Sequence, residues 1–475
     1  MKLNELTIAQ ALEGLKKKQF SSVELTKACI AQIKKHNREI NAFITVCEEG
    51  ALEQAKKTDN LASKGDAFRG KIPLLGIPIA LKDLFSTKGI KTTAGSKVLE
   101  NYMPPYDATV VEKLKAAGAV IIGKTNLDAW GHGSSGENSD FGPTKNPWNK
   151  AYVPGGSSSG SAAAVATDMC LGATGTDTGG SIRTPASFCN VVGLKPTYGR
   201  VSRYGIIAMA SSLDSIGHLT KTVEDAALLL NVTAGNDSHD ATTPIKEVTD
   251  YTKKIKDGIK GIKIGLPKEY NVKAKIDSSD IKIFQDLGAE IIDISLPHTE
   301  YAVACYYIIQ PAEVSSNLAR YDGIRYGSER QNFGEEAKRR IMLGTYTLSA
   351  GYYDAYYKKA MQVRTLIRED FIKAYKKVDV ILAPVSPTAP WQLGTKADDP
   401  LKMYLSDIYT VTANLAGIPS LAVPCGFSKE GLPIGMQILG PQFSEETLFK
   451  IGYFYQETTG WHKQKPVMRV KKENG

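Results

Sequence analysis

Residues 155–164 read Gly155-Gly156-Ser157-Ser158-Ser159-Gly160-Ser161-Ala162-Ala163-Ala164, and residues 175–185 read Gly175-Thr176-Asp177-Thr178-Gly179-Gly180-Ser181-Ile182-Arg183-Thr184-Pro185. Both stretches consist mainly of small residues, and glycine allows a backbone to approach its neighbours closely. They lie within residues 124–220, which are rich in Gly, Ser, Thr and Asn and have little local propensity for helix or strand. A region of this kind inside a compact chain usually surrounds a functional site.

Two common motifs do not explain these stretches. A phosphate-binding loop ends in Gly-Lys-Ser/Thr, and residues 155–164 contain no such ending. A Gly-x-Ser-x-Gly pattern is centred on Ser158, but a nucleophile elbow follows a buried strand and works with a histidine. The preceding residues 146–154 contain two prolines and two asparagines, which do not fit a central strand. The sequence therefore disfavours an α/β-hydrolase.

Composition limits the class of protein. The chain has 475 residues, of which 42% are hydrophobic and 23% charged, as is typical of a globular protein. The formal net charge is +9, but acidic and basic residues are intermixed, so this excess is only weak evidence for direct contact with nucleic acid. The six histidines and six cysteines form no metal-ligand motif, and we expect free thiols in a reducing compartment and no metal site.

The N-terminal residues predict a cytoplasmic chain. Residues 1–6 lead into a charged amphipathic segment instead of the apolar core of a signal peptide. No stretch of about 18 apolar residues without a charge occurs, so we expect no membrane span.

Hydrophobic patterning predicts an α/β fold with a buried sheet. Residues 7–36 read as two helices, and Ser21 with Glu24 forms a capping box at the start of the second. From residue 71, short apolar runs alternate with helical patterns, as expected for a buried sheet. The predicted strands are residues 76–81, 119–122, 261–266, 291–294, 378–382 and 421–423. Tyrosine-rich helices are predicted between 299 and 376.

Taken together, residues 155–164 and 175–185 resemble the signature motif of the amidase family in order and spacing. Outside the motif, residues 80–83 match the lysine segment of the family, and residues 123–126 lead into the motif. The order of features follows the family from about residue 10 to residue 460. The resemblance implies an α/β amidase-signature fold, with a large twisted mixed β-sheet covered by helices on both faces. It also implies one large domain, in which an N-terminal helical segment (1–65) packs on the signature domain (66–475).

The resemblance assigns three catalytic roles: Ser181 is the nucleophile, Ser157 the bridging serine and Lys82 the base. A serine hydroxyl needs a neighbour that takes its proton, and Ser–Lys systems do this without histidine. The lysine must be neutral, and burial after the apolar residues 77–81 would lower its pKa. The family also implies a cis peptide bond between Gly156 and Ser157.

The glycines beside Ser181 fit an oxyanion hole. Such a hole needs main-chain N–H groups that no side chain covers. The expected donors are the backbone amides of Thr178, Gly179, Gly180 and Ser181. Asp177 is expected to brace this loop by accepting backbone hydrogen bonds, and Arg183 to pair with a buried carboxylate.

Further stretches resemble one branch of the family, the glutaminase subunits of tRNA-dependent amidotransferases. They are residues 315–327, 338–345, 351–359 and 414–419. This resemblance implies that glutamine is the substrate, with Arg340 binding its α-carboxylate, Asp407 its α-ammonium, and Tyr306 closing the pocket. The adjacent Arg339 is an alternative to Arg340.

The same resemblance implies partners. A B subunit would bind tRNA and use ATP and magnesium to activate the misacylated amino acid, a small C subunit would complete the complex, and this chain would need no cofactor. The sequence leaves open whether tRNA(Gln), tRNA(Asn) or both are served. Two alternatives also remain: a stand-alone amidase for aryl or aliphatic amides, and a non-catalytic assembly subunit. The chain departs from the family pattern at residues 127–133, at His218 and in the short stretch 328–336.

Overall fold

The computed structural model describes residues 2–63, 72–396 and 399–468, and a single mixed sheet of eleven strands runs through these residues. The strands lie in the order β1-β3-β2-β4-β6-β5-β10-β11-β9-β7-β8. Their bounds are β1 (Phe43–Val46), β2 (Pro78–Lys82), β3 (Val120–Thr125), β4 (Gly172–Asp177), β5 (Val192–Lys195), β6 (Ser215–Thr220), β7 (Lys263–Pro267), β8 (Glu290–Ile294), β9 (Val380–Pro384), β10 (Ser420–Phe427) and β11 (Pro433–Leu439).

The direction of the strands changes across the sheet. β3, β2 and β4 run parallel to one another, and so do β9, β7 and β8. Between these two groups, each neighbouring pair from β4 to β9 is antiparallel. The predicted large mixed sheet is therefore confirmed.

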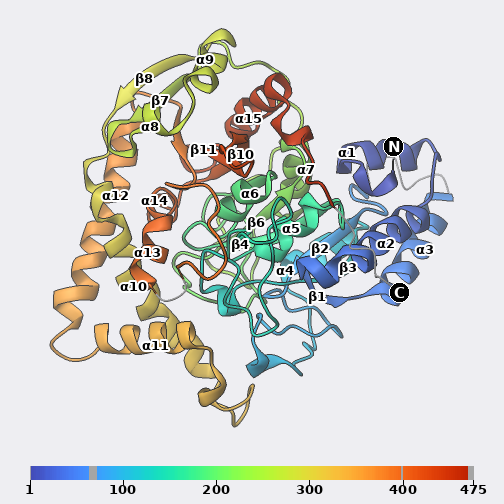
Figure 1. Ribbon diagram of the computed structural model, residues 1–475, viewed down its shortest axis with the longest axis horizontal. Helices are drawn as coiled ribbons and strands as arrows, with labels where there is room; N and C mark the ends of the chain where they lie inside the picture. Colours follow the sequence, from blue (N-terminus) through green and yellow to red (C-terminus); the bar gives the residue numbers. More distant parts are fainter. Residues whose placement is uncertain (1, 64–71, 397–398, 469–475) are drawn as a thin grey trace.

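Helices cover the sheet (Figure 1). Their bounds are α1 (Ile8–Lys16), α2 (Ser22–Ile40), α3 (Glu48–Ser63), α4 (Thr109–Ala116), α5 (Ser159–Ala166), α6 (Arg183–Cys189), α7 (Val223–Thr233), α8 (Val272–Lys275), α9 (Ser278–Asp286), α10 (Ala302–Asn317), α11 (Glu335–Thr347), α12 (Lys359–Ala374), α13 (Pro400–Tyr404), α14 (Val411–Ala416) and α15 (Glu445–Thr459).

Two glycines of β4 show that helices cover both faces. A Cβ at Gly172 would lie 3.1 Å from Ile8 of α1 and 3.2 Å from Leu229 of α7. A Cβ at Gly175 would lie 2.8 Å from Ile182, next to α6. Residues three apart in a strand point to opposite faces. The helices α1 and α7 therefore lie on one face, and α6 lies on the other.

Strands with strong apolar patterns were predicted correctly, and central strands with weak patterns were missed. The capping box at Ser21 and Glu24 is present, and all six predicted strands exist with shifted ends. The strands β4 and β6 have the sequences GATGTD and SIGHLT, and neither was predicted. Glycine has low β-propensity, so packing against the neighbouring elements places these residues in the sheet.

The N-terminal residues share the sheet with the rest of the chain. β1 pairs with β3 in an antiparallel arrangement. Just before β1, Asn41 adopts a left-handed conformation, and its Nδ2 donates to the carbonyl groups of Phe141 and Gly142, at 3.0 Å each. The boundary expected between residues 65 and 66 lies outside the described residues, and the division into two segments stays a prediction.

The cysteines are free, and all but Cys47 are buried. Among the described residues, no helix is long and apolar enough to cross a bilayer. In the same part of the chain, no group of three His, Cys, Asp or Glu side chains is arranged to hold a metal ion.

Candidate active site

Lys82 ends β2 and is completely buried. Its Nζ lies 2.8 Å from Ser157 Oγ, 2.9 Å from Ser158 Oγ and 2.8 Å from Thr176 Oγ1. Thr176 belongs to β4, the parallel neighbour of β2, so the carboxyl ends of the two strands meet at one edge of the sheet. The fold thus brings together Lys82 and Ser157, two of the three predicted catalytic residues.

Burial lowers the pKa of Lys82 to about 7, against the opposing effect of nearby carboxylates, Asp128 first among them. Burial also raises the pKa of Asp128 to about 6, although its carboxylate accepts hydrogen bonds from the N–H groups of Asn138 and Gly136. A substantial fraction of Lys82 is therefore an uncharged amine near neutral pH.

Gly156, before α5, and Gly160, in its first turn, allow the close packing around Ser157. The predicted cis peptide bond between Gly156 and Ser157 is present. A Cβ at Gly156 would lie 1.9 Å from Asp128 Oδ2, and a Cβ at Gly160 would lie 2.3 Å from the carbonyl oxygen of Ala42. A larger residue at either position would displace the backbone that carries Ser157.

Ser181 lies just before α6 and is 8% exposed. Its carbonyl oxygen accepts a hydrogen bond of 3.0 Å from the N–H of Ser158, which fixes the two motif segments side by side. No hydrogen bond joins the hydroxyl groups of Ser157 and Ser181 in the described part of the chain. The structure therefore places the nucleophile segment next to the lysine–serine pair without a direct hydroxyl contact.

The loop 178–181 presents unused main-chain donors. Across the described residues, none of its four backbone N–H groups donates to a protein acceptor. Two of its carbonyl groups, in contrast, are occupied: that of Gly179 accepts from Thr410 Oγ1 at 2.6 Å, and that of Gly180 from the N–H of Thr184 at 2.8 Å. This arrangement suits an oxyanion hole.

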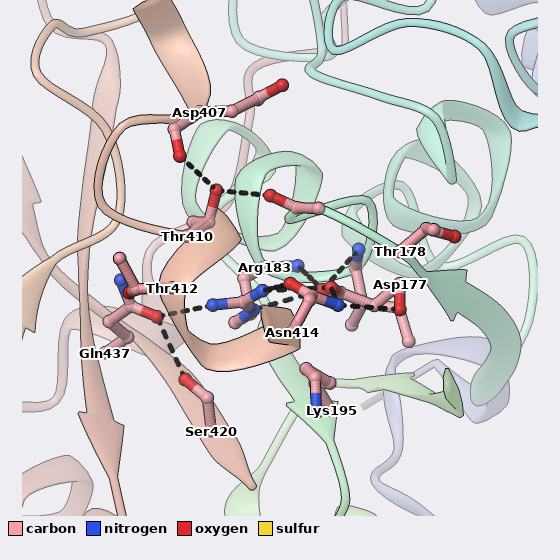
Figure 2. A network of polar contacts seen from close by, with 12 residues as sticks. Asp177, Thr178, Arg183, Lys195, Asp407, Thr410, Thr412, Asn414, Ser420 and Gln437 are labelled. Atoms are coloured by element: carbon pink, nitrogen blue, oxygen red, sulfur yellow. Dashed lines mark hydrogen bonds and ion pairs between the residues drawn. The ribbon is translucent and has the colours of Figure 1, made fainter. Parts of the chain in front are cut away.

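A buried ion pair braces the same loop (Figure 2). Arg183 Nη2 lies 2.9 Å from Asp177 Oδ1, and Asp177 Oδ2 accepts from the N–H of Ile182 at 3.1 Å. Arg183 also donates to Gln437 at 2.8 Å and Asn414 at 2.7 Å. Burial alone would raise the pKa of Asp177, but the charge and hydrogen bonds of Arg183 hold it well below its usual range. Both predicted bracing contacts are present.

The residues expected to bind glutamine lie together. Tyr306 packs against the loop, because a Cβ at Gly179 would lie 2.7 Å from its hydroxyl oxygen. The next residue, Tyr307, donates to Asp407 at 2.8 Å, and the guanidinium of Arg340 lies 5.4 Å from the centre of the Tyr307 ring. Burial raises the pKa of Asp407 to about 6, while the charge of Arg340 acts in the opposite direction.

Arg340, rather than Arg339, is directed at these residues. Arg340 is 2% exposed, donates to Glu336 and Gln310 at 2.8 and 2.9 Å, and also lies over the ring of Tyr404. The side chain of Arg339 is 41% exposed and pairs with Glu336 at the surface. The helical spacing of α11 points the two side chains in different directions.

Several polar residues of the site had no assigned role in the sequence. Ser158 and Thr176 contact the amine of Lys82, and Ser134 donates to both carboxylate oxygens of Asp407, at 2.8 and 2.9 Å. Ser158 and Thr176 stand within the motif itself, so only their distance to Lys82 distinguishes them. Ser134 had one sequence indication, since it directly follows the unusual residues 127–133.

The residues that depart from the family pattern lie in different parts of the fold. His218 bonds to Thr233 at 2.8 Å on α7, and burial lowers its pKa to about 3. Trp130 packs between Tyr321 and Phe333, with ring centres 5.0 and 5.1 Å away. The segment 127–133 therefore connects the site to the residues between α10 and α11, whereas His218 packs against α7.

A buried lysine–serine pair beside a loop of free main-chain amides, carried by a mixed α/β sheet, is the arrangement expected of a serine amidase. The chain belongs to the amidase family, whose profile, described as "Amidase", matches residues 24–449. It is 54% identical to the A subunit of glutamyl-tRNA(Gln) amidotransferase from Desulfatibacillum aliphaticivorans, over 98% of this chain and 100% of that relative.

Two solved structures agree with the assignment to the amidase family. The crystal structure of the A subunit of glutamyl-tRNA(Gln) amidotransferase from Thermotoga maritima has a TM-score of 0.84 and 42% identity, covering 99% of each chain. Native peptide amidase from Stenotrophomonas maltophilia has a TM-score of 0.83 and 30% identity, covering 98% of this chain and 99% of its own.

Proposed function

We propose that this chain is the glutamine-hydrolysing A subunit of a tRNA-dependent amidotransferase. The similarity to such A subunits over nearly the whole chain supports this function. The observation that carries the chemistry is the distance of 2.8 Å between the buried Nζ of Lys82 and Ser157 Oγ. The buried charges of Arg340 and Asp407 favour glutamine over an uncharged amide.

In the first step, Ser181 Oγ attacks the side-chain carbonyl carbon of glutamine. Rotation of the Ser181 side chain brings its hydroxyl to Ser157, which passes the proton to the neutral amine of Lys82. Ser157 can both donate and accept, so it relays the proton without a net change. The oxyanion that forms accepts hydrogen bonds from the amides of the loop 178–181, each contributing about 3–4 kcal/mol.

In the second step, the carbon–nitrogen bond breaks. The proton returns from Lys82 through Ser157 to the departing nitrogen, and ammonia leaves. Water then attacks the glutamyl ester of Ser181, with Lys82 again taking a proton through Ser157. Ser181 recovers its proton, and glutamate is released.

The far end of the pocket would hold the amino-acid group of glutamine. Arg340 binds the α-carboxylate and Asp407 the α-ammonium, and Tyr306 closes the pocket over the side chain. The aromatic rings of Tyr307 and Tyr404 hold the guanidinium of Arg340 in place by cation–π contact.

The proposal includes partners. The ammonia would pass to a B subunit that binds tRNA and uses ATP and magnesium to activate the misacylated glutamate of Glu-tRNA(Gln). A small C subunit would complete a cytoplasmic heterotrimer. This chain contributes no cofactor to the reaction in this scheme.

Ammonia release from glutamine tests the proposal. We expect the chain purified with its partner subunits to hydrolyse glutamine, and Ser181→Ala to lose the activity while keeping the thermal unfolding midpoint. Lys82→Ala and Ser157→Ala should also lose most activity. Transfer of ammonia to Glu-tRNA(Gln) and to Asp-tRNA(Asn), assayed separately, identifies the tRNA that is served.

Other outcomes would favour other functions. Cleavage of an aryl amide without glutamine hydrolysis would indicate a stand-alone amidase. Wild-type ammonia release by Ser181→Ala would remove the catalytic role and leave a subunit that serves only assembly.

A further inference from the structure

His132 has a buried imidazole for which the fold supplies no partner. The residue is 1% exposed, and neither Nδ1 nor Nε2 has a hydrogen-bond partner among the described residues. Buried polar atoms are nearly always paired, so an unpaired one needs an explanation. The imidazole is therefore available to a group from outside the chain.

The position of His132 is between the two ends of the proposed glutamine pocket. A Cβ at the preceding Gly131 would lie 3.7 Å from Ser157 Oγ, at the reacting end. Two residues further on, Ser134 binds the carboxylate of Asp407, at the amino-acid end. The backbone of His132 thus lies between the two ends of the site, and its imidazole is close enough to Arg340 for the charge of that residue to act on it.

The backbone holds His132 in a defined position. Trp130 and Gly133 have φ angles of 60° and 146°, and a Cβ at Gly133 would lie 2.6 Å from Asp128 Cγ. The chain winds tightly around the Asp128 carboxylate, which accepts the N–H groups of Gly136 and Asn138. A fixed donor loses little freedom when a ligand binds.

A second unpaired donor lies beside Arg340. Gln310 is fully buried, its Oε1 accepts from Arg340 Nη1 at 2.9 Å, and its Nε2 has no partner within the described ranges. Burial and then the charge of Arg340 lower the pKa of His132 well below its usual value, so the ring is neutral and carries one N–H donor. A carboxylate, with two oxygens that each accept more than one hydrogen bond, suits such donors.

We propose that His132 and Gln310 complete, with Arg340, a three-residue donor site for the α-carboxylate of glutamine. This inference rests on the proposed function and adds to it the means by which the site distinguishes an amino-acid amide from a plain primary amide. It also gives the unusual segment 127–133 a role in substrate recognition.

Three amides test the inference in the complex with partner subunits: glutamine, glutaramic acid, which lacks the α-ammonium, and 4-aminobutanamide, which lacks the α-carboxylate. We expect His132→Met to raise KM about tenfold or more for glutamine and glutaramic acid, as for the loss of one hydrogen bond to a charged group. The fall in kcat should be smaller, and KM for 4-aminobutanamide should rise far less. Gln310→Met should show the same selectivity.

Conservative variants and a matched control separate recognition from packing. At least one of His132→Asn and His132→Gln, which keep an N–H donor, should retain KM within about threefold of wild type. His218→Met removes a buried histidine that packs against α7, and should leave KM for all three amides as in wild type. Thermal unfolding midpoints verify that each variant is folded.

The inference is overturned if His132→Met changes KM equally for all three amides, or if it changes none of them. It is also overturned if Met, Asn and Gln at position 132 raise KM to the same extent. The proposed function fails separately, if the wild-type complex releases no ammonia from glutamine.

Discussion

The protonation state of Lys82 sets the pH dependence of the proposed reaction. Its pKa is lowered to about 7, and only the neutral amine can take a proton from Ser157. The neutral form grows as pH rises through the pKa, so kcat should rise about tenfold per pH unit on the acid side and level off above about pH 7. Saturating glutamine is needed, because burial raises the pKa of Asp407 to about 6 and Asp407 is the residue proposed to bind the α-ammonium.

Steady-state kinetics between about pH 5 and about pH 9 measure this profile. A kcat that stays constant through the acid half of that range, with the protein still folded, would show that no group with the pKa of Lys82 controls the reaction.

Another single residue, Arg183, contributes to the free energy of unfolding. It is completely buried and pairs with Asp177, and its removal would leave an uncompensated buried carboxylate. Arg183→Met should therefore lower the free energy of unfolding by about 3–5 kcal/mol, as is usual when one partner of a buried pair is removed. Urea unfolding followed by circular dichroism measures the change.

Arg339→Met is the matched control, because its ion pair with Glu336 lies at the surface. Exposed ion pairs contribute about 1 kcal/mol or less. Equal losses in the two variants would contradict the bracing role of Arg183.

At the scale of elements, the site depends on how closely α6 approaches β4. Gly175 of β4 faces Ile182, and a Cβ there would lie 2.8 Å from Ile182 Cγ1 and 2.9 Å from Leu219 Cδ1. Gly175→Ala should lower the free energy of unfolding by about 1–3 kcal/mol through overpacking. Because Ser158 Oγ is also only 3.1 Å away, the contact of Ser158 with Lys82 should weaken as well.

Gly50→Ala in α3 should have the opposite effect on stability. Nothing lies within 4 Å of a Cβ at Gly50, so alanine should stabilise the helix, by up to about 1 kcal/mol. The thermal unfolding midpoint should fall in Gly175→Ala and rise in Gly50→Ala. A stabilising Gly175→Ala would contradict the packing described for β4.

At the scale of the whole molecule, the N-terminal residues are part of the amidase sheet. β1 covers the edge of β3, Asn41 holds the loop at residues 141–142, and the carbonyl of Ala42 packs on Gly160, three residues after Ser157. A chain that begins at residue 47 should fail to reach the native state. In such a chain, β3 loses the strand that pairs with its edge, and α5 loses the carbonyl of Ala42 that packs on Gly160.

The fraction of the truncated chain that remains in solution, and its circular dichroism, test this expectation. Adding the separate fragment 1–46 should restore some folded protein. A truncated chain with the unfolding midpoint of the full chain would instead support an independent signature domain.

The local sequence of this protein determined the features that depend on neighbouring residues. The capping box at Ser21 starts α2, and strong apolar runs produced the strands β2 and β3 where they were expected. The two motif segments together with the lysine segment 80–83 were enough to propose Lys82, Ser157 and Ser181 as catalytic residues, because their residue types and spacing resemble one family.

Only the tertiary structure decided the rest, because the deciding contacts join residues far apart in the chain. The strands β4 and β6 have little propensity of their own and form because helices pack on both faces. The choice of Arg340 over Arg339 follows from the direction of each side chain on α11. The apolar residues 77–81 indicated that Lys82 is buried, but the extent of its burial and the unpaired imidazole of His132 depend on contacts from distant parts of the chain.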